Sequence, residues 1–205
     1  MKKEKFITIG EIMLRLTPPD YEKIRTATSF EARYGGSEAN VALSLANLGV
    51  DASFFTVVPG NSLGKSAVRM MRSNDVNCDS VIYSTEEETP THRLGTYYLE
   101  TGYGIRPSKV VYDRKHSSIN NIEISDVPQT LFYNTRLFHT SGITLGLGGK
   151  AQDFAVHCIK EFKKQGTLIS FDVNYRANLW TGEEARKCIE TILPYVDIFF
   201  CSEDT

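Results

Sequence analysis

Short apolar runs alternate along this chain with longer stretches in which apolar residues recur at helical spacing. The short runs predict strands at 6–9, 53–58, 81–83, 136–139, 167–172 and 196–201. The helical spacing predicts helices at 37–48, 60–74, 150–165 and 183–193. This alternation indicates an α/β fold with a mostly parallel sheet. The unbroken apolar run at 168–171 further indicates a sheet with helices on both faces.

Two segments, 12–34 and 91–118, lack helical periodicity and contain strand-like pieces at 13–16, 95–99 and 109–112. We expect them to form a small separate β-sheet. The α/β body would then consist of 1–11, 35–90 and 119–205. Placed over the carboxyl ends of the body strands, where open α/β sheets bind ligands, this sheet would act as a lid. The alternative is that both segments are surface excursions without function.

The adjacent glycines Gly35 and Gly36 open directly into the predicted helix at 37–48. Glycine lets the backbone turn sharply and come close to a bulky neighbour. Ser37 is the predicted N-cap, and Gly49 is predicted to end the helix in a left-handed conformation. Free N–H groups at such a helix start suit a polar small molecule. A tight strand-to-helix turn with no ligand is the open alternative.

Composition narrows the class of protein. With 205 residues, 41% of them hydrophobic, the chain can bury one sizeable core. The net charge of −2 gives no reason to expect nucleic acid or an anionic membrane as partner. The five-residue apolar stretch after the first lysines is too short for a signal peptide. The four cysteines form no C-x-x-C pair, so we expect no zinc site, no disulfide framework and a cytoplasmic location with reduced thiols.

Two glycine-rich segments resemble nucleotide-binding loops but fail on spacing. The segment 60–66 has three residues where the phosphate-binding loop has four between its glycine and its Gly-Lys pair, and 146–150 lacks the upstream glycine. No G-x-G-x-x-G follows a predicted strand. His139 and His157 have no partner at metal-binding spacing, so both are expected to be structural.

Several short motifs, spread over the whole chain, resemble those of the ribokinase-like (phosphofructokinase-B-type) carbohydrate kinases. They are Gly10-Glu11, Gly35-Gly36-x-x-x-Asn40-Val41-Ala42, Leu48-Gly49, Gly60-x-x-x-Gly64, Ser141-Gly142 and Asp172-Val173-Asn174-Tyr175-Arg176. The last motif, with Leu179-Trp180 beyond it and Tyr112-Asp113-Arg114-Lys115, looks most like 2-keto-3-deoxygluconate kinases. The resemblance implies a ribokinase-like fold. It also implies phosphorylation of 2-keto-3-deoxygluconate to its 6-phosphate with ATP and Mg²⁺.

The resemblance also implies which residues contact the sugar acid, which would lie between body and lid. They are Glu11, Gly35, Gly36, Asn40, Tyr97, Tyr112, Arg114 and Arg176. A guanidinium suits a carboxylate because it can bind both oxygens. The alternatives are a solvated charge for Arg114, a salt bridge to Asp172 or Glu203 for Arg176, and packing within the lid for the tyrosines. For Glu11 the alternative is a cap at the lid hinge.

Asp172, Asn174 and Glu203 are implied to lie near the phosphate and metal end of the cleft, but Ser202 replaces the family's asparagine beside Glu203. The family's Gly-Ala-Gly-Asp motif, which carries the catalytic base, does not occur in the sequence. We therefore assign no catalytic residue and no metal ligand, and expect the base beyond Thr205. The chain resembles the N-terminal two-thirds of a kinase, and we expect it to be inactive alone.

Three further expectations complete the sequence reading. The predicted strand at 196–201 should have an exposed apolar edge. The lid could pair edge to edge with a second copy, which would give a homodimer. The alternative functions are a fructokinase- or ribokinase-like kinase of a neutral sugar and a non-catalytic sugar-binding protein of the same fold.

Overall fold

The computed structural model describes residues 5–84 and 92–203. The predicted boundary between body and lid at 90–91 and the chain end at Asp204 and Thr205 lie outside these ranges. The centre of the fold is a five-stranded, wholly parallel sheet in the order β11-β10-β9-β1-β4. Its strands are β1 (Lys5–Ile9), β4 (Ala52–Phe55), β9 (Thr135–Ser141), β10 (Leu168–Asp172) and β11 (Ile198–Phe200).

Helices cover both faces of this sheet, and alternate side chains of each strand point to opposite faces. On one face Ile7 and Ile9 pack in a cluster with Phe154 and Phe162 of α4 (Gly149–Lys164), beside α5 (Gly182–Ile192). On the other face Phe54 packs against α1 (Ser37–Asn47) and α2 (Ser62–Arg72). We call the five-stranded sheet with these helices and the short α3 (Gly142–Gly146) the body. The α/β prediction is confirmed.

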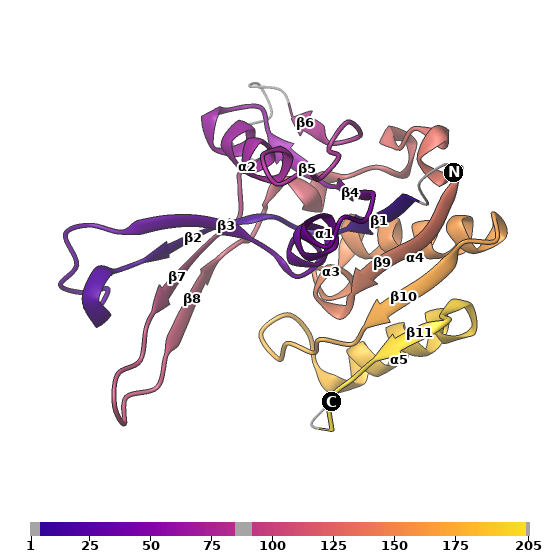
Figure 1. The fold of residues 1–205 in the computed structure, drawn as a ribbon. Helices are drawn as coiled ribbons and strands as arrows, with labels where there is room; N and C mark the ends of the chain where they lie inside the picture. The colour runs from indigo at the N-terminus through magenta and orange to yellow at the C-terminus, as the bar shows by residue number, and fades with distance from the viewer. Residues whose placement is uncertain (1–4, 85–91, 204–205) are drawn as a thin grey trace.

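A second, four-stranded sheet extends from the body (Figure 1). Its order is β3-β2-β7-β8, and its strands are β2 (Met13–Thr17), β3 (Glu31–Gly35), β7 (Thr96–Glu100) and β8 (Lys109–Asp113). The β2–β3 and β7–β8 pairs are antiparallel, whereas β2 and β7 run parallel. Strands therefore form in both segments that lacked helical periodicity, including β3, which the pattern did not single out.

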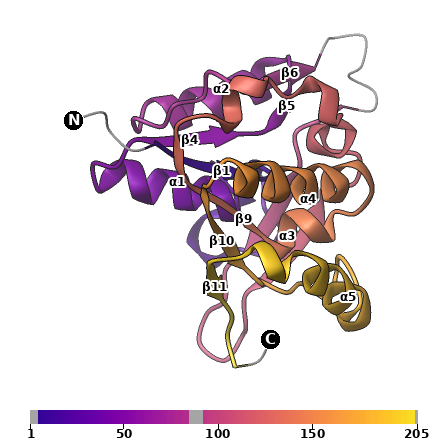
Figure 2. The same cartoon turned by 90° about the vertical axis from the view of Figure 1, so that its right-hand side faces the viewer.

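The predicted strand at 53–58 is two strands. Residue Thr56 separates β4 of the central sheet from β5 (Val57–Pro59), which pairs with β6 (Ile82–Ser84) in a small parallel sheet. Together with α2, this small sheet lies at the opposite end of the body from α5 (Figure 2). The single-strand prediction was wrong because every residue from 52 to 59 is buried, so the hydrophobic pattern carries no mark of the break.

Short 3₁₀ turns complete the chain: η1 (Pro19–Tyr21), η3 (Ser118–Asn121), η4 (Ile124–Asp126), η5 (Gln129–Phe132) and η6 (Leu193–Tyr195). At the edge of the central sheet, the side chains of β11 are exposed, with Phe199 at 45% and Phe200 at 54%. The predicted exposed apolar edge is thus confirmed. No helix in the described part of the chain is long and apolar enough to cross a membrane.

Candidate functional site

The order of the central strands marks one place for a ligand. After β1 the chain leads to α1 on one face, and after β9 it leads to α3 and α4 on the other. Loops that diverge in this way leave a crevice at the carboxyl ends of the strands. A cavity of about 1270 Å³ opens there, between the start of α1, helix α3, the loop after β10 and the four-stranded sheet.

Eight of the eleven residues singled out from the sequence line this one cavity. They are Gly36, Asn40, Tyr97, Tyr112, Arg114, Asp172, Asn174 and Arg176. The three that do not line it are Gly35, which is buried, Glu11, and Glu203, which is exposed near the end of the chain. Residues from four separate stretches of sequence therefore meet at one site.

The turn into α1 brings its backbone against the end of β1. Gly36 is the N-cap residue and Ser37 is the first residue of the helix, so the prediction of Ser37 as N-cap was wrong. A Cβ on Gly36 would lie well within 3.0 Å of the Glu11 carbonyl oxygen, so only glycine fits. The Ser37 hydroxyl instead accepts a hydrogen bond of 3.0 Å from the Asn174 amide. Gly49 has the predicted left-handed conformation, with φ of 78°.

The loop after β10 places its polar groups by local hydrogen bonding. The Asn174 backbone N–H donates to Asp172 Oδ1 at 3.1 Å, and Asn174 has φ of 34°, which is unfavourable for a residue other than glycine. Backbone strain of this kind persists where the surroundings enforce it, often at functional sites. Here the contact of Asn174 with Ser37 joins the end of β10 to the start of α1.

Arg176 lies exposed on the same loop and faces the cavity. The alternative that it forms a salt bridge to Asp172 or Glu203 is wrong, since neither pair comes within ion-pair distance among residues 5–84 and 92–203. The guanidinium is therefore available to an anionic ligand.

Arg114 reaches the cavity from the other wall, at the end of β8. Its guanidinium forms an ion pair with the carboxylate of Glu11, and the two side chains are only 10% and 4% exposed. It also lies over the Tyr112 ring, 5.7 Å from the ring centre, a cation–π arrangement. Arg114 is thus not a solvated charge, and in this structure the carboxylate it holds belongs to Glu11.

Tyr97 and Tyr112 form an aromatic pair at the cavity wall. They are cross-strand neighbours on β7 and β8, and their ring centres are 5.7 Å apart. Their rings pack on each other, as expected for packing within the lid, and they also line the cavity, as expected for residues placed to contact a sugar.

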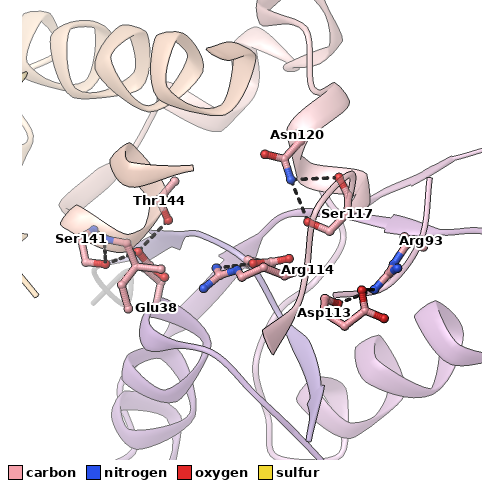
Figure 3. A network of polar contacts seen from close by, with 10 residues as sticks. Glu38, Arg93, Asp113, Arg114, Ser117, Asn120, Ser141 and Thr144 are labelled. Carbon is pink, nitrogen blue, oxygen red and sulfur yellow. Dashed lines mark hydrogen bonds and ion pairs between the residues drawn. The ribbon is translucent and has the colours of Figure 1, made fainter. Parts of the chain in front are cut away.

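Glu38, a buried acid beside the cavity, was not singled out from the sequence. Glu38 on α1 is fully buried, and its Oε1 accepts hydrogen bonds from the Ser141 N–H at 3.0 Å, the Ser141 hydroxyl at 2.7 Å and the Thr144 hydroxyl at 2.7 Å (Figure 3). Burial raises the pKa of this carboxyl even though the hydrogen bonds oppose the shift. Glu38 thereby joins α1 to the β9–α3 turn across the crevice.

The other histidine and acid positions give no metal centre. Within the described ranges no three His, Cys, Asp or Glu side chains gather in a way that could hold a metal ion. His139 is buried, with Nδ1 2.9 Å from the Ser170 hydroxyl, and burial lowers its pKa. His157 packs edge-on against Phe132.

Comparison with known proteins places these features in context. The sequence model for pfkB family carbohydrate kinases matches residues 3–205. The crystal structure of 2-dehydro-3-deoxygluconokinase from Thermotoga maritima is 43% identical with a TM-score of 0.90, over 95% of this chain and 58% of that one. Among curated relatives, 2-dehydro-3-deoxygalactonokinase of Haloferax volcanii is 32% identical over 97% of this chain and 61% of the relative. The 2-dehydro-3-deoxygluconokinase of Bacillus subtilis is 29% identical over 86% of this chain and 53% of the relative. The chain thus spans less than two thirds of the length of each.

Proposed function

Because the chain belongs to the pfkB family of carbohydrate kinases, we propose that it carries the sugar-binding site of a kinase for 2-keto-3-deoxy sugar acids. The observation that carries this proposal is the pair of arginines, Arg114 and Arg176, on opposite walls of one cavity. The preferred substrate is 2-keto-3-deoxygluconate, phosphorylated at its 6-hydroxyl.

The charges of the cavity favour an acid over a neutral sugar. Arg176 has no carboxylate partner among the described residues, so a carboxylate ligand gains a charge-assisted hydrogen bond there. A neutral sugar would leave that donor unpaired after water is excluded, which lowers its affinity. Asn40 and Ser37 on the body side offer neutral polar groups for the sugar hydroxyls.

A second candidate is the galactonate epimer of the same acid. The relative from Haloferax volcanii bears the name 2-dehydro-3-deoxygalactonokinase, which supports testing it. The two acids differ at one hydroxyl carbon, so the same two arginines serve both. Discrimination between them would depend on hydrogen bonds from the tyrosine pair and Asn40.

The proposed phosphoryl donor is ATP with Mg²⁺, as in the family. The described residues do not form a metal site by themselves, because they hold no cluster of three candidate ligands. Asp172 and Asn174 are the oxygen donors of the cavity nearest to the strand end, and we propose that they face the phosphate end of the ligand. The four-stranded sheet β3-β2-β7-β8 would serve as the lid that excludes water.

Isothermal titration of the chain with sugar acids tests the proposal without requiring turnover. 2-Keto-3-deoxygluconate should bind, its galactonate epimer should bind with its own affinity, and fructose should bind much more weakly. Arg176→Ala should weaken binding of the acid by about 2 kcal/mol, or roughly 30-fold, for the loss of a charge-assisted contact.

The matched control is Arg186→Ala, which removes an exposed arginine on α5 that pairs only with Glu190 among the described residues. Its affinity for the acid should equal that of the unchanged chain. Equal binding of fructose and the acid, or no effect of Arg176→Ala, would contradict the assignment and favour the neutral-sugar kinase. No binding of any of these sugars would remove the proposed function.

A further inference from the structure

Four connections join the body to the four-stranded sheet, and all of them meet at Glu11. The connections are residues 10–12 before β2, residue 36 after β3, residues 94–95 before β7 and residues 114–117 after β8. Glu11 belongs to the first connection and is 4% exposed. Glu11 therefore contacts both parts of the molecule.

The backbone and the side chain of Glu11 each restrict another connection. A Cβ on Gly36 would overlap the Glu11 carbonyl oxygen, and a Cβ on Gly95 would overlap Glu11 Oε1. Both approaches are closer than 3.0 Å, a distance that real Cβ atoms do not reach. The two connections therefore pack against Glu11 with no room for a side chain.

The fourth connection is held by charge. Glu11 Oε2 pairs with the Arg114 guanidinium, and both side chains are almost fully removed from solvent. A buried carboxylate is costly unless a partner compensates its charge, and removal of one partner from such a pair is strongly destabilising. The ion pair thus ties the end of β8 to the end of β1.

The cavity lies on the other side of this pair. Arg114 lines it, whereas Glu11 does not. Because Glu11 holds Nη2 of the Arg114 guanidinium and the Tyr112 ring lies 5.7 Å from the guanidinium carbon, the orientation of Arg114 is fixed before any ligand arrives.

We propose that Glu11 is a positioning residue rather than a sugar contact. It holds the four-stranded sheet in place on the body and orients Arg114 toward the carboxylate of the sugar acid. The first role stands on the geometry alone, and the second rests on the proposed function.

Hydrogen–deuterium exchange of the ligand-free chain tests the first role. In Glu11→Gln, which keeps the size of the side chain but removes its charge, backbone amides of β2 and β7 should exchange about tenfold faster or more, since a buried ion pair is lost. Exchange in β9 and β10 of the body should be unchanged. The control is Glu31→Gln, which removes the exposed partner of Arg33 on β3 and should alter neither set of amides.

Gly95→Ala provides a second route to the same site. Its methyl group would displace the Glu11 carboxylate from Arg114, so it should reproduce the faster exchange with the charge still present. Gly182→Ala is its control, because a Cβ there meets nothing within 4 Å. If Glu11→Gln does not fold, the exchange of Gly95→Ala decides whether Glu11 holds the sheet. Unchanged exchange of β2 and β7 in every folded variant would overturn that role.

A double-mutant cycle tests the second role by titration with 2-keto-3-deoxygluconate. As a single substitution, Glu11→Gln should weaken binding of the acid about tenfold. Added to Arg114→Ala, it should cause no further loss, because both substitutions act through one guanidinium. Additive losses would identify Glu11 as a direct sugar contact, and tighter binding would show that Glu11 merely neutralises Arg114. Either outcome overturns the positioning role in binding.

The two proposals fail in different ways. If the unchanged chain binds no sugar acid, the proposed function fails while the exchange experiment still decides whether Glu11 holds the sheet. If the unchanged chain binds the acid and the cycle shows no coupling between Glu11 and Arg114, only the positioning role in binding fails.

Discussion

Two buried glutamates beside the cavity, Glu11 and Glu38, bind other parts of the protein rather than facing the cavity. Glu11 pairs with Arg114, and Glu38 accepts three hydrogen bonds from the β9–α3 turn. Glu38 Oε2 lies so close to Gly10 that a Cβ on Gly10 would overlap it. Both carboxyl groups are buried at the junction of β1 with α1. Their first effect is to fix the walls of the cavity relative to each other.

The raised pKa of Glu38 predicts a pH dependence of stability. A carboxyl whose pKa is higher in the folded than in the unfolded state stabilises the fold below its ordinary value of 4.5, and this contribution is lost as the pH rises through the folded-state pKa. Glu38→Gln cannot ionise but keeps an oxygen for the three donors. The free energy of unfolding of the unchanged chain, relative to Glu38→Gln, should therefore fall as the pH rises above 4.5.

Urea unfolding of both proteins over a series of pH values measures this difference. Glu190→Gln, at an exposed position on α5, is the control and should show no such trend. A difference between the unchanged chain and Glu38→Gln that stays constant with pH would refute the interpretation of Glu38 as a buried acid that resists ionisation.

Eight of the cavity residues could be predicted from sequence motifs, because most of them lie in or just after strands β3, β8 and β10. The partners of these residues could not. Glu11 and Arg114 are 103 positions apart, as are Glu38 and Ser141, and no local pattern reports a contact over that separation. The pairing of Glu11 with Arg114 therefore emerges only from the packing of the four-stranded sheet on the body.

At the scale of the elements, the cavity depends on close approaches between the ends of strands. The turn from β9 into α3 passes against the end of β10, where a Cβ on Gly142 would overlap the Val173 carbonyl oxygen. The Ser141 hydroxyl accepts from the Ile143 N–H at 3.1 Å and begins the helix. These contacts hold α3 beside the cavity.

Gly142→Ala should be destabilising for this reason. Because the neighbour is backbone and cannot rotate away, we expect a loss of about 1–3 kcal/mol in the free energy of unfolding, the usual cost of overpacking. Thermal unfolding measures it, with Gly182→Ala as the control at an open position on α5. A melting temperature of Gly142→Ala equal to that of the control would contradict the close packing of these strand ends.

Element prediction succeeded where periodicity and end signals agree. The predicted helix at 150–165 is observed as Gly149–Lys164, and the predicted strand at 167–172 as Leu168–Asp172. It failed for α3, because five residues are too few to display a helical period. It also failed to identify β3, whose first three residues are exposed and give no alternation of buried and exposed positions.

At the scale of the whole molecule, one parallel sheet separates two hydrophobic clusters. The four-stranded sheet extends from the body (Figure 1) and contributes Met13, Tyr97 and Tyr112 to the cavity lining. The cavity therefore has one wall from each part. Association of two copies through the four-stranded sheet stays a prediction, as does its closing motion. The fold alone does not select the ligand; we propose that the charges on the two walls do.

The most direct test is a crystal structure of the chain with 2-keto-3-deoxygluconate. The account predicts that the sugar acid lies in the cavity with its carboxylate within hydrogen-bonding distance of Arg176 and Arg114, while Glu11 still holds Arg114 from behind. A sugar acid bound with its carboxylate away from both guanidinium groups, or bound outside this cavity, would contradict the account.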